Sequence, residues 1–195
     1  MTRLPCRWRV AGCVAALTAL CAPAEAATLA LAEDSAFDQY AFAVGYHDIH
    51  DLPKAIAYYT KAIKMDPGFA KAYYGRGIAR AQSDDLGGAI ADLRWTIALD
   101  PRMTNAYLNR GHAFFDLGLW PEDSADYTEV IARAPAVTEA YRGRALARAR
   151  AGDVAGALRD VEAALRRASP DVRGQLFDLQ RDLRARLAPA PEPAS

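Results

Sequence analysis

The fold is decided by one stretch, KAYYGRGIARAQSDDLGGAIADLRWTIALDP (residues 71–101), whose pattern returns 34 residues later as NAYLNRGHAFFDLGLWPEDSADYTEVIARAP (residues 105–135). Several columns keep this period. They are Ala72-Tyr73, Ala106-Tyr107 and Ala140-Tyr141; Arg76-Gly77, Arg110-Gly111 and Arg144-Ala145; Asp66-Pro67, Asp100-Pro101 and Ala134-Pro135; and Ala55, Ala89 and Ala157. A fixed period of this length indicates stacked copies of one small structural unit.

Each unit has the pattern of two packed helices. Apolar residues recur at helical spacing, as in Ile56, Tyr59 and Ile63. Small residues midway along each first helix let two antiparallel helices approach closely, and large side chains fill the remaining space. Proline ends each second helix because it has no N–H and disfavours helix in the residue before it. The small residues are Ala43, Gly77, Gly111 and Ala145; the large ones are Tyr59, Leu93, Tyr127 and Val161.

These columns resemble the tetratricopeptide repeat (TPR) family, and the resemblance covers residues 36 to about 169. It implies an all-α, right-handed solenoid of four helical hairpins. We place the repeats at residues 36–69, 70–103, 104–137 and 138–169, followed by a capping helix at 170–187. The expected helices are 35–48 with 53–65, 70–83 with 86–99, 104–117 with 120–133, 138–151 with 154–168, and a last helix at 171–187.

Both ends of the chain differ from the repeats. Arg3, Arg7 and Arg9 precede an apolar run at 10–22, and Ala24-Glu25-Ala26 offers a small-x-small cleavage site. This pattern predicts a signal peptide at residues 1–26, export by the Sec route to a bacterial periplasm, and no membrane attachment after cleavage. The alternatives are an uncleaved N-terminal anchor and, less favoured, a lipidated cysteine. Residues 27–35 read as a linker, and the Pro/Ala/Glu-rich residues 188–195 as a disordered tail.

Cysteine usage and charge exclude several kinds of function. The three cysteines, Cys6, Cys13 and Cys21, all precede the predicted cleavage site. We therefore expect no disulfide, thiol nucleophile or cysteine-bound metal in the exported protein. Lys+Arg and Asp+Glu both number 24, which gives no electrostatic reason to expect nucleic acid as a partner.

A column of arginines predicts ion pairs inside the repeats. Arg76, Arg110 and Arg144 are each followed 16 residues later by an aspartate: Asp92, Asp126 and Asp160. The first repeat lacks both members, with Phe42 and Tyr58 in their places. Because the arginine and the aspartate are either both present or both absent in a repeat, we interpret each pair as a structural link between the two helices of that repeat. Arg80 and Arg148 replace a usually apolar residue, and we expect their stems to pack while their charged heads reach water.

The family resemblance implies a ligand-binding face along the first helices. The residues it selects are Phe37, Tyr40, Val44 and His47; Lys71, Tyr74, Ile78 and Gln82; Asn105, Leu108, His112 and Phe115; and Glu139, Arg142, Leu146 and Arg150. Tyr40, Tyr74, Leu108, His112 and Phe115 would make an apolar lining, which is typical of a surface that binds a peptide or protein. The carboxylate clamp of chaperone-binding members is absent, with only Asn109 at a matching position.

No constellation of residues predicts catalysis. The sequence contains no glycine-rich phosphate loop, nucleophile elbow or HExxH motif. His47 and His50 lie where a helix enters a turn, and the only other histidine, His112, is two repeats away, so we expect neither a metal nor another cofactor. The sequence therefore predicts a non-catalytic scaffold or adaptor that binds a peptide or protein partner in its concave groove. The alternative is a structural protein that acts through self-association of its repeats.

Overall fold

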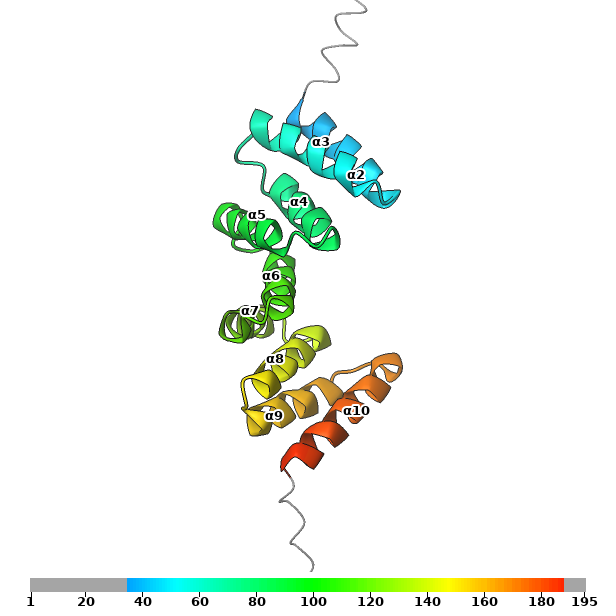
Figure 1. Ribbon diagram of the computed structural model, residues 1–195, viewed down its shortest axis with the longest axis vertical. Coiled ribbons are helices and arrows are strands. Elements are labelled where there is room, and N and C mark those ends of the chain that lie inside the picture. Colours follow the sequence, from blue (N-terminus) through cyan, green and yellow to red (C-terminus); the bar gives the residue numbers. More distant parts are fainter. Residues whose placement is uncertain (1–34, 188–195) are drawn as a thin grey trace, which may run out of the picture.

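The computed structural model describes residues 35–187 as an elongated stack of helices (Figure 1). Nine α-helices and no strand occur in this range. The predicted all-α solenoid of four hairpins with a final capping helix is therefore confirmed. The predicted signal peptide, most of the linker and the predicted tail lie outside the described residues.

Four hairpins follow one another along the stack, and α10 closes its C-terminal end (Figure 1). Each second helix also packs on the first helix of the next hairpin. The hairpins are α2 (Ala36–Asp48) with α3 (Leu52–Met65), α4 (Ala70–Gln82) with α5 (Leu86–Leu99), α6 (Thr104–Asp116) with α7 (Trp120–Arg133), and α8 (Thr138–Arg150) with α9 (Val154–Leu165); the last helix is α10 (Pro170–Leu187). Helix α9 ends at Leu165, before the predicted residue 168.

An aspartate begins the second helix of three repeats. The side chains of Asp51, Asp85 and Asp153 accept hydrogen bonds from backbone N–H groups in the first turns of α3, α5 and α9. Such a cap satisfies a donor that has no partner within the helix. In the third repeat Leu119 holds this position, and α7 begins without a side-chain cap.

The turn inside each hairpin requires one residue with positive φ. His50 and Asp84 adopt φ values of 61° and 65° in the first two repeats, whereas Gly118 and Gly152 adopt 75° and 91° in the last two. These four positions are spaced by the 34-residue period. Glycine adopts this conformation with little strain, whereas residues with a Cβ atom are strained there.

The core is built from the predicted columns of small and large side chains. Tyr59, Leu93, Tyr127 and Val161 are at most 2% exposed. Two of these side chains also reach the next repeat. A Cβ atom on Gly75 or Gly143 would come within 2.5 Å of the ring of Tyr59 or Tyr127, so glycine permits the contact between hairpins.

Helix α10 closes the stack by burying one side. Leu176 and Leu183 are each 1% exposed and pack against α8 and α9. Leu179 packs at the margin of this cluster, whereas Leu187, the last residue of α10, is exposed. No helix within residues 35–187 is long and apolar enough to span a membrane.

Candidate functional site

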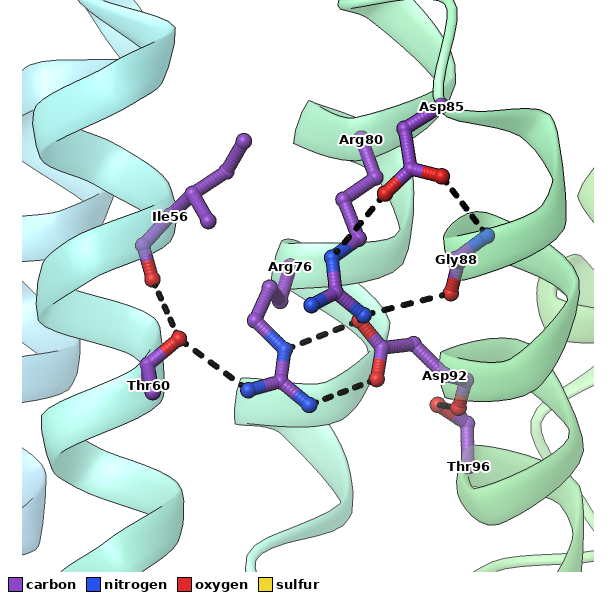
Figure 2. Close-up of polar contacts among 8 residues, drawn as sticks. All are labelled: Ile56, Thr60, Arg76, Arg80, Asp85, Gly88, Asp92 and Thr96. Atoms are coloured by element: carbon purple, nitrogen blue, oxygen red, sulfur yellow. Dashed lines mark hydrogen bonds and ion pairs between the residues drawn. The ribbon is translucent and has the colours of Figure 1, made fainter.

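A buried polar network joins three helices around Asp92 (Figure 2). Arg76 donates to both carboxylate oxygens of Asp92, at 2.8 and 2.7 Å, and to the Thr60 hydroxyl at 3.0 Å. The Thr60 hydroxyl in turn donates to the Ile56 carbonyl oxygen. Because Thr60 lies on α3, Arg76 on α4 and Asp92 on α5, the network also connects the first repeat to the second.

The head of Arg80 belongs to this network, contrary to the expectation that it reaches water. Its guanidinium donates to Asp92 at 2.8 Å and lies 3.6 Å from the helix-capping Asp85 (Figure 2). An expectation based on snorkelling fails here because Asp92, 3% exposed at its side chain, offers a second site for a cation. We call Thr60, Arg76, Arg80 and Asp92 the second-repeat network.

The fourth repeat reproduces this arrangement and the third does not. Arg144 donates to Asp160 and Thr128, and Arg148 also donates to Asp160 at 2.8 Å. In the third repeat Arg110 donates twice to Asp126, at 2.8 and 2.6 Å. The positions equivalent to the threonine and the second arginine there hold Arg94 and Phe114. The structure therefore brings together all three predicted Arg–Asp pairs, but in two kinds of surroundings.

Three neighbouring depressions run along the first helices of the last three repeats. Shared residues join them into one groove, which we call the first-helix groove. Their volumes are about 290, 350 and 220 Å³. The first two share His112 and Asp116, and the last two share Glu139 and Arg142. The α4–α6 depression is lined by Ile78, Ala81, Gln82, Leu86, Asn109, His112, Ala113 and Asp116; the α6–α8 depression by His112, Phe115, Asp116, Tyr127, Glu139, Arg142, Gly143 and Leu146; and the α8–α10 depression by Thr138, Glu139, Arg142, Ser169, Val172, Gln175 and Leu176.

The lining of the α6–α8 depression combines apolar and polar side chains. Glu139 accepts from Arg142 at 2.6 Å, which lowers the pKa of the glutamate carboxyl and raises the pKa of the guanidinium. The same carboxylate oxygen lies 3.7 Å from His112 Nε2. Burial lowers the pKa of His112 from its ordinary value, so the imidazole is neutral at pH 7. The negative charge of Glu139 and the positive charge of Arg142 therefore compensate each other in this lining.

Comparison with known proteins agrees with the hairpin geometry. Residues 40–101 and 108–172 match the model of the tetratricopeptide repeat family. This chain is a tetratricopeptide-repeat protein. Members of the family are generally non-catalytic interaction modules. A search of curated protein sequences finds no match.

Solved structures place this tetratricopeptide-repeat protein among similar solenoids. The crystal structure of MamA is similar with a TM-score of 0.69 and 26% identity, over 72% of this chain and 82% of that chain. The first TPR of Spaghetti (RPAP3), bound to HSP90 peptide SRMEEVD, has a TM-score of 0.57 and 26% identity, over 63% of this chain and 95% of that chain. MamA 41-end from Desulfovibrio magneticus RS-1 has a TM-score of 0.69, over 79% of this chain and 92% of that chain. Because its identity is only 17%, this similarity shows the fold alone.

The structure distributes the predicted groove residues unevenly. His112, Phe115 and Arg142 line the first-helix groove, as do Ile78, Gln82, Glu139 and Leu146. Tyr40 instead packs on Tyr59 and Phe69, with ring centroids 5.8 and 5.0 Å apart. Lys71 and Asn105 are exposed but lie outside the three depressions, and half-buried Leu108 packs against the core around Tyr127.

Three predicted groove residues, His47, Gln82 and Tyr74, form links between neighbouring first helices. His47 Nε2 lies 2.8 Å from the side-chain oxygen of Gln82. The Tyr74 hydroxyl accepts from the Asn109 amide at 2.9 Å, and burial raises the pKa of Tyr74. Tyr74 is therefore half-buried and fixed in place. Three residues of the predicted apolar lining, Tyr74, Leu108 and Phe115, are each only partly exposed.

Sequence reasoning missed the contributions of other helices to the groove. Tyr127 comes from α7, Ser169 precedes α10, and Val172 and Gln175 lie on α10. A face read from the first helices alone does not include them. Asp116 was missed as well, although it lies one residue after the predicted Phe115 and at the same repeat position as the selected Gln82. Within the described range, no group of three or more His, Cys, Asp or Glu side chains is arranged to hold a metal ion.

Proposed function

We propose that this tetratricopeptide-repeat protein is a non-catalytic scaffold or adaptor that binds a peptide segment of another protein in the first-helix groove. The observation that carries the proposal is the continuity of the three depressions, from Ile78 on α4 to Gln175 on α10. A continuous groove lined by both apolar and polar side chains suits a segment that inserts side chains at intervals. The peptide complex of the similar RPAP3 repeat domain supports this mode of binding.

A capture experiment with matched variants tests this function. The protein, Leu146→Arg and Trp95→Ala would each be used to capture partners from the exported fraction, followed by mass spectrometry. Leu146 lines the groove, whereas exposed Trp95 lies on α5 outside it. Filling the groove should cost about 2 kcal/mol of binding or more, while Trp95→Ala should keep the partner. Circular dichroism must first show equal helical content. A partner that Leu146→Arg retains would place binding on another face.

Self-association is a second candidate, favoured by the N-terminal end of the stack. Phe42 and Ile49 on this side of the first repeat are 46% and 71% exposed. They border a hollow of about 220 Å³ that is also lined by Ala41, Gly45 and Tyr46. Analytical ultracentrifugation separates the two functions, because a monomer at micromolar concentration favours the adaptor and a concentration-dependent oligomer favours the structural role.

We also propose that the protein is exported, with cleavage after Ala26. The proposal is supported by the positive start, the apolar run at 10–22 and the Ala24-Glu25-Ala26 site. N-terminal sequencing of the exported protein should begin at Ala27. A product that retains residues 10–22 would instead favour an N-terminal membrane anchor.

A further inference from the structure

The charges of the first-helix groove do not balance. Only Asp116, Glu139 and Arg142 carry a full charge among its lining residues at pH 7. Glu139 and Arg142 compensate one another at 2.6 Å. Asp116 is exposed, and its carboxylate has no hydrogen bond or ion pair with any residue in the described part of the chain. The groove therefore presents one uncompensated negative charge.

Asp116 lies where two depressions meet. It lines both the α4–α6 and the α6–α8 depressions. Apolar side chains line each of these depressions, with Ile78 and Leu86 in one and Phe115 and Leu146 in the other. A ligand that filled both depressions would pass its middle portion over this carboxylate.

The position of Asp116 in its helix is unfavourable for the free protein. It is the last residue of α6, where the partial negative charge of the helix end repels a carboxylate. The equivalent residues of the second and fourth repeats, Gln82 and Arg150, avoid this repulsion, whereas Asp48 of the first repeat shares it but lies outside the groove. A cation bound here would be attracted by both the carboxylate and the helix end.

We infer that the first-helix groove binds an extended peptide in which a lysine or arginine is flanked on both sides by apolar side chains, with the cation on Asp116. The inference rests on the proposed function and adds the chemistry of the partner. An acidic side chain finds no free cation in the groove, because Arg142 is already paired with Glu139. Neutral His112 supplies none either.

Selection from a library of displayed random peptides tests the inference on the purified protein. Selected sequences should be enriched in lysine or arginine between leucine, isoleucine, phenylalanine or methionine, and depleted in aspartate and glutamate. The binding of a selected peptide should weaken about tenfold in Asp116→Asn, as expected for a partly exposed charge pair. Asp48→Asn is the matched control, because Asp48 ends α2 at the equivalent repeat position and lies outside the groove.

A charge reversal adds a second measurement. Asp116→Lys should bind a selected peptide only after its central lysine is changed to glutamate. Asp116→Asn should also melt at the same or a slightly higher temperature, because it removes a repulsion at the end of α6. Weaker binding in a protein that is no less stable would distinguish a binding residue from a structural one.

The outcomes separate this inference from the proposed function. If selected peptides are acidic, or bind Asp116→Asn and the protein equally, the inferred chemistry is wrong. The groove assignment would still stand if Leu146→Arg abolished their binding. If Leu146→Arg bound them normally, or if no peptide were selected, both the inference and the proposed function would be overturned.

Discussion

The second and third repeats solve the same packing problem with different polar contacts. In the second repeat Asp92 accepts from two arginines, and Thr60 extends the network into the preceding repeat. In the third repeat Asp126 accepts from Arg110 alone. The fourth repeat follows the second. The solenoid thus has two repeats with extended networks on either side of one with a single pair.

The reason for the difference lies in two substitutions. Arg94 replaces the threonine that would accept from Arg110, and it is exposed. Phe114 replaces the second arginine and is 6% exposed, next to the guanidinium of Arg110 at 5.9 Å from the ring centroid. The third repeat exchanges charge-assisted hydrogen bonds for apolar burial and a weaker cation–π contact. It also lacks the aspartate cap at Leu119.

This weaker local bonding coincides with the proposed binding surface. Helix α6 of the third repeat lines the α4–α6 and α6–α8 depressions, and Tyr127 of α7 lines the second of them. Regions that bind ligands are often drawn from the less stable parts of a protein. We therefore expect amide hydrogen exchange to be faster in α6 and α7 than in α4 and α5.

The largest expected effect is that of removing Asp92. Asp92→Ala leaves both Arg76 and Arg80 without their shared carboxylate, whereas Asp126→Ala leaves only Arg110 unpaired. Breaking a buried ion pair costs about 3–5 kcal/mol, so we expect roughly 4 for Asp92→Ala and roughly 3 for Asp126→Ala. Urea unfolding followed by circular dichroism measures both. Equal losses would mean that Arg80 contributes nothing to the second-repeat network.

The simpler pair of the third repeat allows a cleaner test of direct coupling. Arg110→Leu and Asp126→Leu each leave one charge unpaired in a largely buried site. The double variant should be milder than either single variant, by about 1–3 kcal/mol of coupling energy, because it leaves no unpaired charge. Urea unfolding of the four proteins in a double-mutant cycle gives this energy. Strictly additive losses would argue against a direct interaction.

Adding an aspartate cap to α7 should reduce the difference in local stability between the second and third repeats. Leu119 is exposed and occupies the position of Asp51, Asp85 and Asp153. Leu119→Asp should stabilise the protein by about 1 kcal/mol, since its carboxylate can accept from the first turn of α7. Slower amide exchange confined to α6 and α7 would show that the gain is local. Leu119→Ala is the control, because it removes the leucine without adding a cap.

The sequence allowed the hairpins and the Arg–Asp pairs to be predicted because both depend on spacing within one repeat. The Thr60 and Arg80 contacts were missed, although Thr128 and Arg148 repeat them two units later. The Thr60 contact crosses from one hairpin to the next, so it depends on how the hairpins stack. The Arg80 contact lies within one hairpin, but spacing alone assigned Asp92 a single arginine.

The groove was only partly predictable for the same reason. A helical face identifies which residues point inward, but it does not show what already occupies the space. Tyr40 is engaged by Tyr59 and Phe69, and Tyr74 by Asn109. The open part of the groove is therefore displaced toward the third and fourth repeats and α10. Signal cleavage remains a prediction.

The smallest expected effect concerns the hairpin turns, where the first two repeats differ from the last two. Asp84 adopts φ 65° at a position that Gly118 and Gly152 fill elsewhere. Glycine removes the strain of the Cβ atom but makes the unfolded chain more flexible, and aspartate tolerates this conformation better than most residues. The two effects nearly cancel, so Asp84→Gly should stabilise by only about 0.5 kcal/mol.

The reverse change, Gly118→Ala, should destabilise by about 1 kcal/mol, because alanine fits a positive φ poorly. Thermal melting of both variants measures the difference. If Gly118→Ala were neutral, the third repeat would be accommodating strain by rearranging its turn, and its weaker bonding would extend to the backbone.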